Sequence, residues 1–252
     1  MKISIITASY NSAKTLARTM DSVLAQNYPD LEYIIIDGAS TDNTREIVES
    51  YQNKLNIKFI SEPDNGIYDA MNKGVRLATG DIVGILNSDD FYDNGNVLNN
   101  IAGAFEDNKI DAVYGDIKYF GEDINKITRY WQAGEYTESK FNNGWMMPHP
   151  TLFVRKSVYE KCGLFNTNLK LAADYEFILR LLKIHKINIK YLQETLVRMY
   201  NGGASGSNLK QRIKGWQEDR EAWKMNSLRV PRLFIIRRLI SKLGQFINKP
   251  KI

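Results

Sequence analysis

The stretch of sequence that decides the fold covers Tyr33–Thr44 and reads YIIIDGASTDNT. The apolar run extends back to Leu31 and ends at Asp37, and such an isoleucine-rich run is typical of a buried strand. A glycine and several small polar residues follow, which favours a turn and then a helix over Thr41–Tyr51. A buried strand that passes through a short turn into a helix is the repeating unit of a parallel sheet covered by helices.

The alternation of strand and helix continues through the first half of the chain. Strands are also predicted at Lys2–Thr7, Ile57–Ser61, Asp81–Leu86 and Asp111–Gly115, and helices at Ser12–Ala25, Ile67–Ala78 and Gly95–Asn108. On the first of these helices apolar residues recur every three or four positions, so one face is suited to lie on a sheet. The sequence therefore predicts an α/β fold with a Rossmann-like start, in which a mostly parallel sheet carries helices on both faces.

The second half has a mixed pattern after Gly115. Strands are predicted at Asp116–Phe120, Lys126–Trp131, Asn188–Tyr191 and Leu196–Tyr200, and helices at Lys156–Cys162, Ala173–Ile184, Leu209–Met225 and Val230–Ile247. A connection rich in aromatic residues, asparagine and glycine covers Ala133–Pro148. Long connections inside a compact domain are usually functional or disordered. We expect this half to extend the same domain and to end in a helical extension.

The composition limits the classes of protein to which the chain can belong. With 252 residues, 43% of them hydrophobic, the chain can bury one large core. Its single cysteine, Cys162, cannot form an intramolecular disulfide, and one cysteine with two histidines excludes a zinc site of the usual kind. The apolar run Ile3–Ile6 is too short for a signal peptide, and no uncharged run approaches the roughly 18 apolar residues of a membrane span. We therefore expect a cytoplasmic protein.

Positive charge is concentrated at the C-terminal end. The chain has a net charge of +5, but the residues from Leu209 onward carry twelve Lys and Arg against three acids. At helical spacing this tail has an apolar stripe, comprising Leu233, Ile236, Ile240, Leu243 and Ile247, opposite the basic residues Arg238, Lys242 and Lys249. Such a helix is suited to lie on an anionic bilayer, here the inner face of the plasma membrane, as a peripheral contact. The alternative is packing on the body of the protein or on a second copy in a homodimer.

Nucleic acid is not an expected partner, because no aromatic and basic side chains are interleaved on a predicted sheet.

Acidic residues stand at the carboxyl ends of the predicted strands, where ligands bind in open α/β sheets. Asp37 can accept hydrogen bonds from a nucleobase or a ribose, or it can cap the next helix, although Ser40 or Asp42 could do so instead. The group Asn87–Asp90 follows another strand. Its carboxylates could hold Mg²⁺ or Mn²⁺ beside a diphosphate, or the group could form a plain Asx turn.

Two further acidic positions lie at helix starts. Asp64 and Asp69 flank the start of the helix predicted from Ile67, and the helix dipole explains at least one of them. Asp174 lies at the start of the helix predicted from Ala173. A carboxylate there could act as a general base that takes a proton from an incoming hydroxyl, or it could cap the helix.

Several other residues are weaker candidates for contact with a ligand. His149 lies between two prolines and could bind a diphosphate or an acceptor, or it could shape its loop. Trp145 is the aromatic residue best placed to stack on a sugar, whereas packing is the simpler explanation for Trp131, Tyr136 and Phe141. The turn Asn201–Gly206 could close over phosphates through its backbone N–H groups, with Arg212 beyond it as a phosphate contact, or it could be a plain loop.

Five motifs in order resemble those of the family 2 glycosyltransferases, which have the GT-A fold. They are Ile3–Asn11, Ser22–Gln26, Ile36–Thr44, Asn87–Asp90 and Ala173–Glu176. Within that family the chain is similar to the bacterial polysaccharide enzymes of the colanic-acid type. The resemblance implies a GT-A catalytic domain over residues 1–208, with a nucleotide-binding half (1–115) and an acceptor half (116–208), followed by the basic helical tail (209–252).

The roles of the family carry over to the matching positions. The resemblance implies that Asp89, with Asp90 beside it, holds Mn²⁺ or Mg²⁺ and that Asp174 is the catalytic base. The residues implied to hold the nucleotide are Thr7, Ala8, Ser9, Tyr10, Asp37, Asp64 and Ser88. The chain departs from the family at Asn87, where the first Asp of the metal motif commonly stands, so the charge of the metal site is weakened.

The resemblance implies a single in-line displacement at the anomeric carbon, with inversion. The expected donor is a nucleotide-diphosphate sugar, preferably of UDP, and the expected acceptor is a hydroxyl of a lipid-linked glycan in bacterial surface polysaccharide synthesis. Two alternatives remain. Asn87 makes a non-catalytic sugar-nucleotide binding module conceivable, and a nucleotidyltransferase would release pyrophosphate instead of a nucleoside diphosphate.

Overall fold

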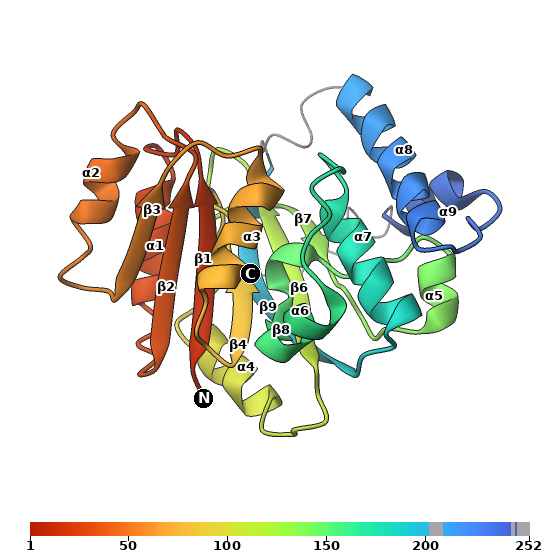
Figure 1. Cartoon of the computed structure of the whole chain (residues 1–252), viewed down its shortest axis with the longest axis horizontal. Helices are drawn as coiled ribbons and strands as arrows, with labels where there is room; N and C mark the ends of the chain where they lie inside the picture. The colour runs from red at the N-terminus through yellow and green to blue at the C-terminus, as the bar shows by residue number, and fades with distance from the viewer. Residues whose placement is uncertain (202–208, 243–244, 246–252) are drawn as a thin grey trace.

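The computed structural model describes residues 1–201, 209–242 and 245, and in this part of the chain nine strands form one mixed sheet (Figure 1). The strands are β1 (Ile3–Ser9), β2 (Leu31–Asp37), β3 (Ile57–Ser61), β4 (Ile82–Ile85), β5 (Phe91–Tyr92), β6 (Ala112–Phe120), β7 (Ile127–Trp131), β8 (Phe153–Arg155) and β9 (Ile189–Tyr200). Their order is β3-β2-β1-β4-β8-β6-β9-β5, and β7 pairs with β6 outside this path.

The first four strands of this order are parallel, and their register fixes where the site forms. Ser9 of β1 lies opposite Asp37 of β2, and Asp37 lies opposite Ser61 of β3. The carboxyl ends of these strands therefore meet at one edge of the sheet. Beyond β4, strand β8 runs antiparallel to both of its neighbours, whereas β6 and β9 are parallel to each other.

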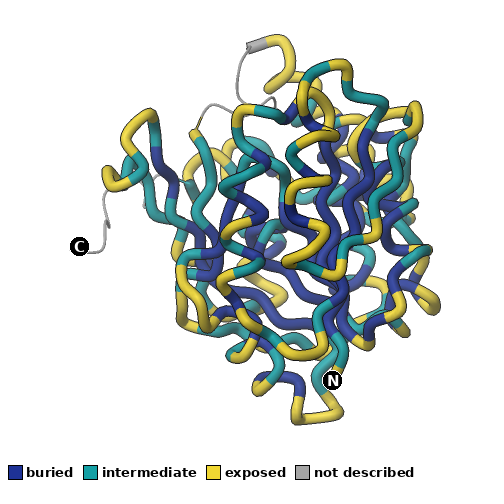
Figure 2. The backbone as a smooth tube through the Cα atoms, turned by 90° about the vertical axis from the view of Figure 1, so that its left-hand side faces the viewer, coloured by how far each residue is buried: buried dark blue, intermediate teal, exposed yellow. Residues whose placement is uncertain are grey.

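Helices cover both faces of the sheet. They are α1 (Leu16–Leu24), α2 (Thr44–Glu49), α3 (Ile67–Leu77), α4 (Val97–Ala104), α5 (Glu138–Asn142), α6 (Lys156–Cys162), α7 (Ala173–Leu179), α8 (Leu209–Met225) and α9 (Phe234–Ser241). One core lies between the sheet and α1, α2 and α4, and the other lies between the sheet and α3, α6 and α7. Figure 2 shows the strands buried and the connecting loops exposed. The predicted α/β fold with helices on both faces is confirmed.

Several predicted elements differ from those in the structure. The strands predicted at Asp111–Gly115 and Asp116–Phe120 form the single strand β6, and those predicted at Asn188–Tyr191 and Leu196–Tyr200 form the single strand β9. The pairing of β6 with β9 continues past β-bulges around Asp116. The long connection contains the short helix α5, whose start is capped by Thr137. The helix predicted to end at Ile184 becomes π-helical from Arg180 onward. Arg180 pairs with Glu176 and also donates hydrogen bonds to the backbone carbonyls of Cys162 and Leu164.

The tail packs on the body of the protein. In α8, the buried Glu218 accepts hydrogen bonds from the backbone of Leu171 and Ala172, directly before α7. Trp223 donates a hydrogen bond to the hydroxyl of Tyr175 (2.8 Å). Helix α9, predicted to extend over Val230–Ile247, is described only from Phe234 to Ser241. Leu243, Ile247, Lys249 and the turn residues 202–206 lie outside the described residues.

Helix α9 turns its charged side inward. Phe234 is buried against Tyr175 and Trp223, and Arg238 forms an ion pair with the buried Asp219 (2.9 Å). The predicted apolar stripe faces solvent instead, since the described members Leu233, Ile236 and Ile240, together with Leu239, are between 44% and 66% exposed. The alternative of packing on the body is therefore realised, but by the basic side of the helix and not by the apolar side.

Candidate active site

The carboxylate of Asp37 organises the edge where β1, β2 and β3 end. Asp37 is buried and accepts hydrogen bonds from the hydroxyls of Ser9 (3.0 Å) and Ser61 (2.7 Å). The backbone N–H and the hydroxyl of Ser40 donate to it as well. These four bonds hold the turn after β2 against the two neighbouring strands. Asp37 thus fixes the turn after β2 against β1 and β3, and its predicted contact with the nucleotide stays a prediction.

A second group lies around Gly38, where Tyr10 and Asp64 approach the turn. A Cβ atom added at Gly38 would lie 2.7 Å from a carboxylate oxygen of Asp64 and 3.4 Å from the ring of Tyr10. The ring is 66% exposed, and Asp64 is half-buried. A planar ring beside a carboxylate can stack on a nucleobase while the acid accepts a hydrogen bond from it. Gly38 leaves the space that this approach requires, and the sequence motif alone did not single it out.

Three further residues predicted to hold the nucleotide lie near the end of β1 and in the loop after β4, namely Thr7, Ala8 and Ser88. The hydroxyl of Thr7 is buried and donates to the carbonyl of Leu86 (2.8 Å), which ties β1 to the end of β4. Ala8 is also buried. The hydroxyl of Ser88 lies 2.8 Å from that of Ser12. These residues therefore shape the edge of the sheet between the Asp37 turn and the loop after β4.

The loop after β4 carries Asn87, Asp89 and Asp90. Asp89 is half-buried, and Arg18 of α1 donates a hydrogen bond to its backbone carbonyl (3.1 Å). Asp90 is fully buried and accepts a hydrogen bond from the side chain of Asn87 (2.9 Å). Burial, followed by the adjacent charge of Asp89, raises the pKa of Asp90 to about 8. The two acids are thus placed differently, and Asp89 is the more accessible one.

The donor atoms of this loop fit a hard divalent cation. Mg²⁺ and Mn²⁺ prefer oxygen ligands and usually share them with phosphate oxygens. The side-chain oxygen of Asn87 is buried and has no hydrogen-bond partner among the described residues. No group of three metal-ligating side chains occurs in the described part of the chain. The candidate protein ligands of a cation held here are the carboxylate of Asp89 and the side-chain oxygen of Asn87.

Asp174 lies in the first turn of α7 and is held by Tyr68 of α3, whose hydroxyl donates to its carboxylate (3.0 Å). Burial, and then the charge of Asp174, raises the pKa of Tyr68 well above its usual value, so Tyr68 stays a donor. The segment before α7 is clamped by the buried side chain of Asn72, which exchanges two hydrogen bonds with the backbone of Phe165 (2.9 and 3.0 Å). Tyr68 lies in the helix predicted from Ile67, but no spacing rule indicates its contact with a residue 106 positions away.

His149 is placed close to Asp174 but is buried. Its ring packs edge-on against Phe165, with 5.4 Å between ring centroids. Burial lowers the pKa of His149, while the nearby charge of Asp174 opposes this shift. The imidazole thus packs in the core beside Phe165, and its predicted contact with a diphosphate or an acceptor stays a prediction. Arg212 lies on an exposed side of α8, so its predicted phosphate contact stays a prediction.

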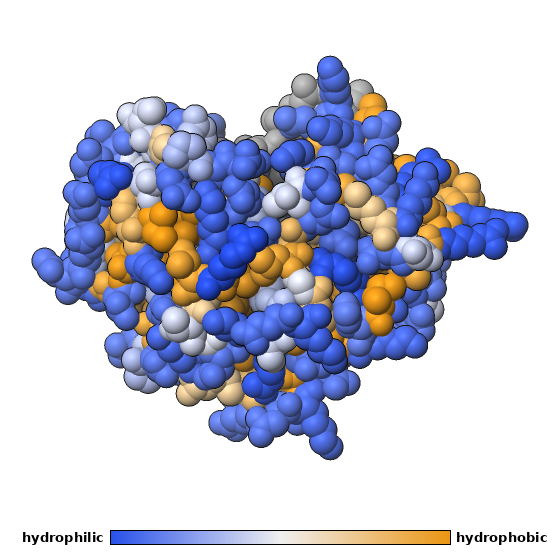
Figure 3. All heavy atoms as spheres, viewed as in Figure 1, coloured by the Kyte–Doolittle hydropathy of each residue, from blue (hydrophilic) through white to orange (hydrophobic). Residues whose placement is uncertain are grey.

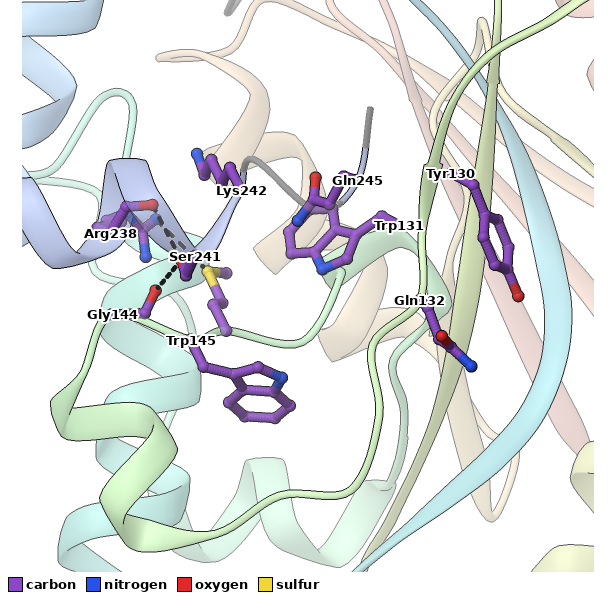
Figure 4. A pocket seen from close by; sticks show the side chains of 10 residues that line it. Tyr130, Trp131, Gln132, Gly144, Trp145, Arg238, Ser241, Lys242 and Gln245 are labelled. Atoms are coloured by element: carbon purple, nitrogen blue, oxygen red, sulfur yellow. Dashed lines mark hydrogen bonds between the residues drawn. The ribbon is translucent and has the colours of Figure 1, made fainter. Parts of the chain in front are cut away.

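A pocket of about 170 Å³ opens between the end of β7, the loop after α5 and α9 (Figure 4). Trp145 lines it and donates a hydrogen bond to the carbonyl of Ala133 (2.6 Å). Trp131, which the sequence assigns to packing, lines the pocket as well, together with Arg238 and Lys242 of the tail. Arg238 lies over the ring of Tyr175, the residue after Asp174, with 4.4 Å between the guanidinium carbon and the ring centre.

Comparisons with known proteins identify the family of the chain. Residues 4–163 match the description of Glycosyl transferase family 2. The chain is 30% identical over 209 residues to the PGL/p-HBAD biosynthesis glycosyltransferase of Mycobacterium tuberculosis, covering 81% of this chain and 79% of that protein.

Two solved structures share the fold. One is TarS of S. aureus in complex with UDP-GlcNAc, with a TM-score of 0.70, 22% identity, and coverage of 95% of this chain and 73% of that one. The other is the mannosyltransferase PcManGT of Pyrobaculum calidifontis in complex with GDP-Man and Mn²⁺, with a TM-score of 0.69, 18% identity, and coverage of 97% and 70%. The architecture is therefore the GT-A fold, as predicted. The chain belongs to glycosyl transferase family 2 and is a glycosyltransferase.

Proposed function

We propose that the protein transfers a sugar from a nucleoside-diphosphate donor, preferably of UDP, to an acceptor hydroxyl, with inversion at the anomeric carbon. The observation that carries this proposal is that three groups lie around the carboxyl ends of the parallel strands. Tyr10, Gly38 and Asp64 offer a site for the base, the loop Asn87–Asp90 offers oxygen ligands beside a diphosphate, and Asp174 is fixed by Tyr68. UDP-GlcNAc is bound by TarS and GDP-Man by PcManGT, which supports a donor of this class.

In the proposed reaction, the acceptor oxygen bonds to the anomeric carbon as the bond from that carbon to the diphosphate breaks. Asp174 takes the proton of the acceptor hydroxyl, and the nucleoside diphosphate leaves with the electron pair of the broken bond. Tyr68 orients the carboxylate of Asp174, and Asn72 fixes the segment before its helix. Asp89 would hold the divalent cation together with the diphosphate. When bound, such a cation offsets the negative charge that grows on the leaving group.

We assign the nucleotide to residues 1–115 and the acceptor to residues 116–208 together with the tail. The pocket between β7, the loop after α5 and α9 supports this division, because its described walls come from the acceptor half and the tail. No helix in the described part of the chain is long and apolar enough to cross a membrane.

We infer that the acceptor is a lipid-linked glycan reached at the surface of an anionic membrane, at its cytoplasmic face. The exposed apolar residues of α9 lie beside the exposed Arg232 and Arg237. Figure 3 shows apolar and strongly hydrophilic side chains next to each other on the side of the molecule where α9 lies. This combination is typical of a helix that rests in the interface of a bilayer.

The test of the reaction is release of nucleoside diphosphate from UDP-, GDP- and dTDP-sugars, with and without Mn²⁺, against a membrane lipid extract. We expect Mn²⁺-dependent release of one nucleoside diphosphate. Asp174→Asn should lose transfer by about 10²- to 10⁴-fold, the usual contribution of a positioned general base, and should keep its nucleotide affinity.

Each contrary result points to a defined alternative. Normal turnover by Asp174→Asn would remove Asp174 from the mechanism. Release of pyrophosphate would indicate nucleotidyl transfer, and binding of UDP without turnover of any donor would favour a non-catalytic binding module.

A further inference from the structure

The pocket beside α9 has aromatic walls and a cationic end. Trp131 and Trp145 line it from the body of the protein, and Arg238, Ser241 and Lys242 line it from the tail (Figure 4). Its volume of about 170 Å³ is far more than a single water molecule needs. Aromatic walls with a few convergent polar groups are typical of sites that hold small organic ligands.

Three basic residues converge at this end of the pocket. Arg129 of β7 donates a hydrogen bond to Gln245 (2.7 Å), and its guanidinium lies 5.7 Å from the ring centre of Trp131. Arg238 pairs with Asp219, and Lys242 follows one turn later on the same side of α9. No acidic residue is among the described residues that line the pocket.

The described ion pair at this end is that of Arg238 with Asp219, and Lys242 adds a second positive charge from the tail. Burial lowers the pKa of Lys242 to about 8, and repulsion by Arg238 and then Arg129 adds to this shift. The nearby acids Asp219 and Asp174 counteract it less strongly than either arginine. In addition, one terminal nitrogen of the Arg238 guanidinium is buried and has no hydrogen-bond partner among the described residues. Leaving such a donor unsatisfied is unfavourable, and an anion at this position would remove that cost.

We infer that this pocket is a subsite for a negatively charged group of the acceptor, a carboxylate or a phosphate, with Trp131 and Trp145 against the adjoining sugar. The inference rests on the proposed function and names the chemical class of the acceptor. Arg238 lies over the ring of Tyr175, the residue after Asp174, so an anion held by Lys242 and Arg238 would place the neighbouring part of the acceptor near the start of α7. With a neutral acceptor, Arg238 keeps Asp219 as its ion-pair partner, but its buried terminal nitrogen stays without a hydrogen-bond partner among the described residues.

The test is ligand-observed NMR titration of the full chain, with saturating UDP to block the donor site. The probes are methyl β-glucuronide for a carboxylate, glucose 1-phosphate for a phosphate, and methyl β-glucoside as the neutral match. The variants are Lys242→Gln, which removes the charge, and Lys242→Arg, which keeps it. We expect at least one charged probe to bind more tightly than the glucoside, and to bind about 10- to 100-fold more weakly to Lys242→Gln, as for loss of a charged hydrogen bond.

The charged probe that binds more tightly identifies the source of the anion. Lys242→Arg should retain most of the wild-type affinity, and the glucoside should not distinguish the variants. Equal affinity for charged and neutral probes, binding of neither charged probe, or an unchanged affinity in Lys242→Gln would each overturn the inference. The affinity for UDP, measured on the same samples, reports separately on the proposed donor site. A failure of that site is therefore distinguishable from a failure of the pocket.

Discussion

At the scale of single residues, the hydrogen bond between Tyr68 and Asp174 is the contact that fixes the candidate base. Tyr68→Phe removes only the hydroxyl. We expect kcat to fall by about tenfold or more, since a hydrogen bond to a charged group contributes roughly 1.5–3 kcal/mol, while KM for the donor stays unchanged. Steady-state kinetics with varied donor and acceptor check this.

The matched control is Tyr28→Phe, which removes a hydroxyl that bonds to the carbonyl of Met1. This variant should keep full activity. If the two variants lost kcat equally, or if Tyr68→Phe lost nucleotide affinity instead of kcat, Tyr68 would not act through Asp174.

Lys242 leads to a prediction about pH. Its pKa of about 8 means that its charge is present below that pH and is lost above it. The surrounding Arg129 and Arg238 stay charged throughout, and Asp219 and Asp174 are the acids that face it. An anion stabilises the protonated form, so affinity for the charged probe should fall as the pH rises from 7 to 9.

The comparison that isolates this effect is Lys242→Arg, whose guanidinium does not titrate in this range. Its affinity for the charged probe should stay constant over the same interval. Parallel pH curves for the wild type and Lys242→Arg would assign the titration to another group.

At the scale of elements, the docking of α9 depends on Gly144, in the loop after α5. Gly144 has a φ of +86°, and a Cβ added there would lie 2.6 Å from backbone atoms of Arg238. Gly134 has a φ of +67° but has no atom within 4 Å of an added Cβ. Gly134→Ala therefore introduces backbone strain of about 1–2 kcal/mol, whereas Gly144→Ala adds a clash that must displace α9.

We expect Gly144→Ala to lose binding of the charged probe and acceptor turnover while retaining UDP affinity. Gly134→Ala should lower only the melting temperature. Equal effects of the two alanines on acceptor turnover would show that α9 does not build the pocket.

Some of the helices and strands could be predicted from the sequence, and others could not. Strands β2 and β3 match their predicted ranges, because an apolar run bounded by turn residues is a local signal. The merged strands β6 and β9 were divided wrongly, since a bulge is stabilised by the partner strand and leaves little trace in local pattern. Helix α9 was predicted with its apolar side as the binding side, but its burial is determined by Phe234 and by the pairing of Arg238 with Asp219.

At the scale of the whole molecule, the site combines segments far apart in the chain. The acids at the strand ends could be predicted, because parallel strands end at one edge of the sheet and this places Asp37 and Asp89 there. The pocket could not be predicted, because it forms only when the tail packs on α7 and on the loop after α5. Hydrophobic periodicity describes one helix at a time and does not report such a contact.

The outward side of α9 leads to the last prediction, which concerns attachment of the whole molecule to a membrane. Ile236 and Ile240 are 53% and 60% exposed, so replacing both with Asp should leave the fold intact. Loss of two apolar contacts and the added negative charge should weaken binding to vesicles with anionic lipid by at least about tenfold. Sedimentation with vesicles measures this. Raising the salt concentration should also weaken binding of the wild type, because salt screens the attraction of Arg232 and Arg237 to anionic lipid.

Ile213→Asp on α8 is the control, because Ile213 is 44% exposed but lies outside α9, and this variant should bind like the wild type. Unchanged binding of the α9 double variant, or an equal loss in Ile213→Asp, would exclude α9 as the membrane contact.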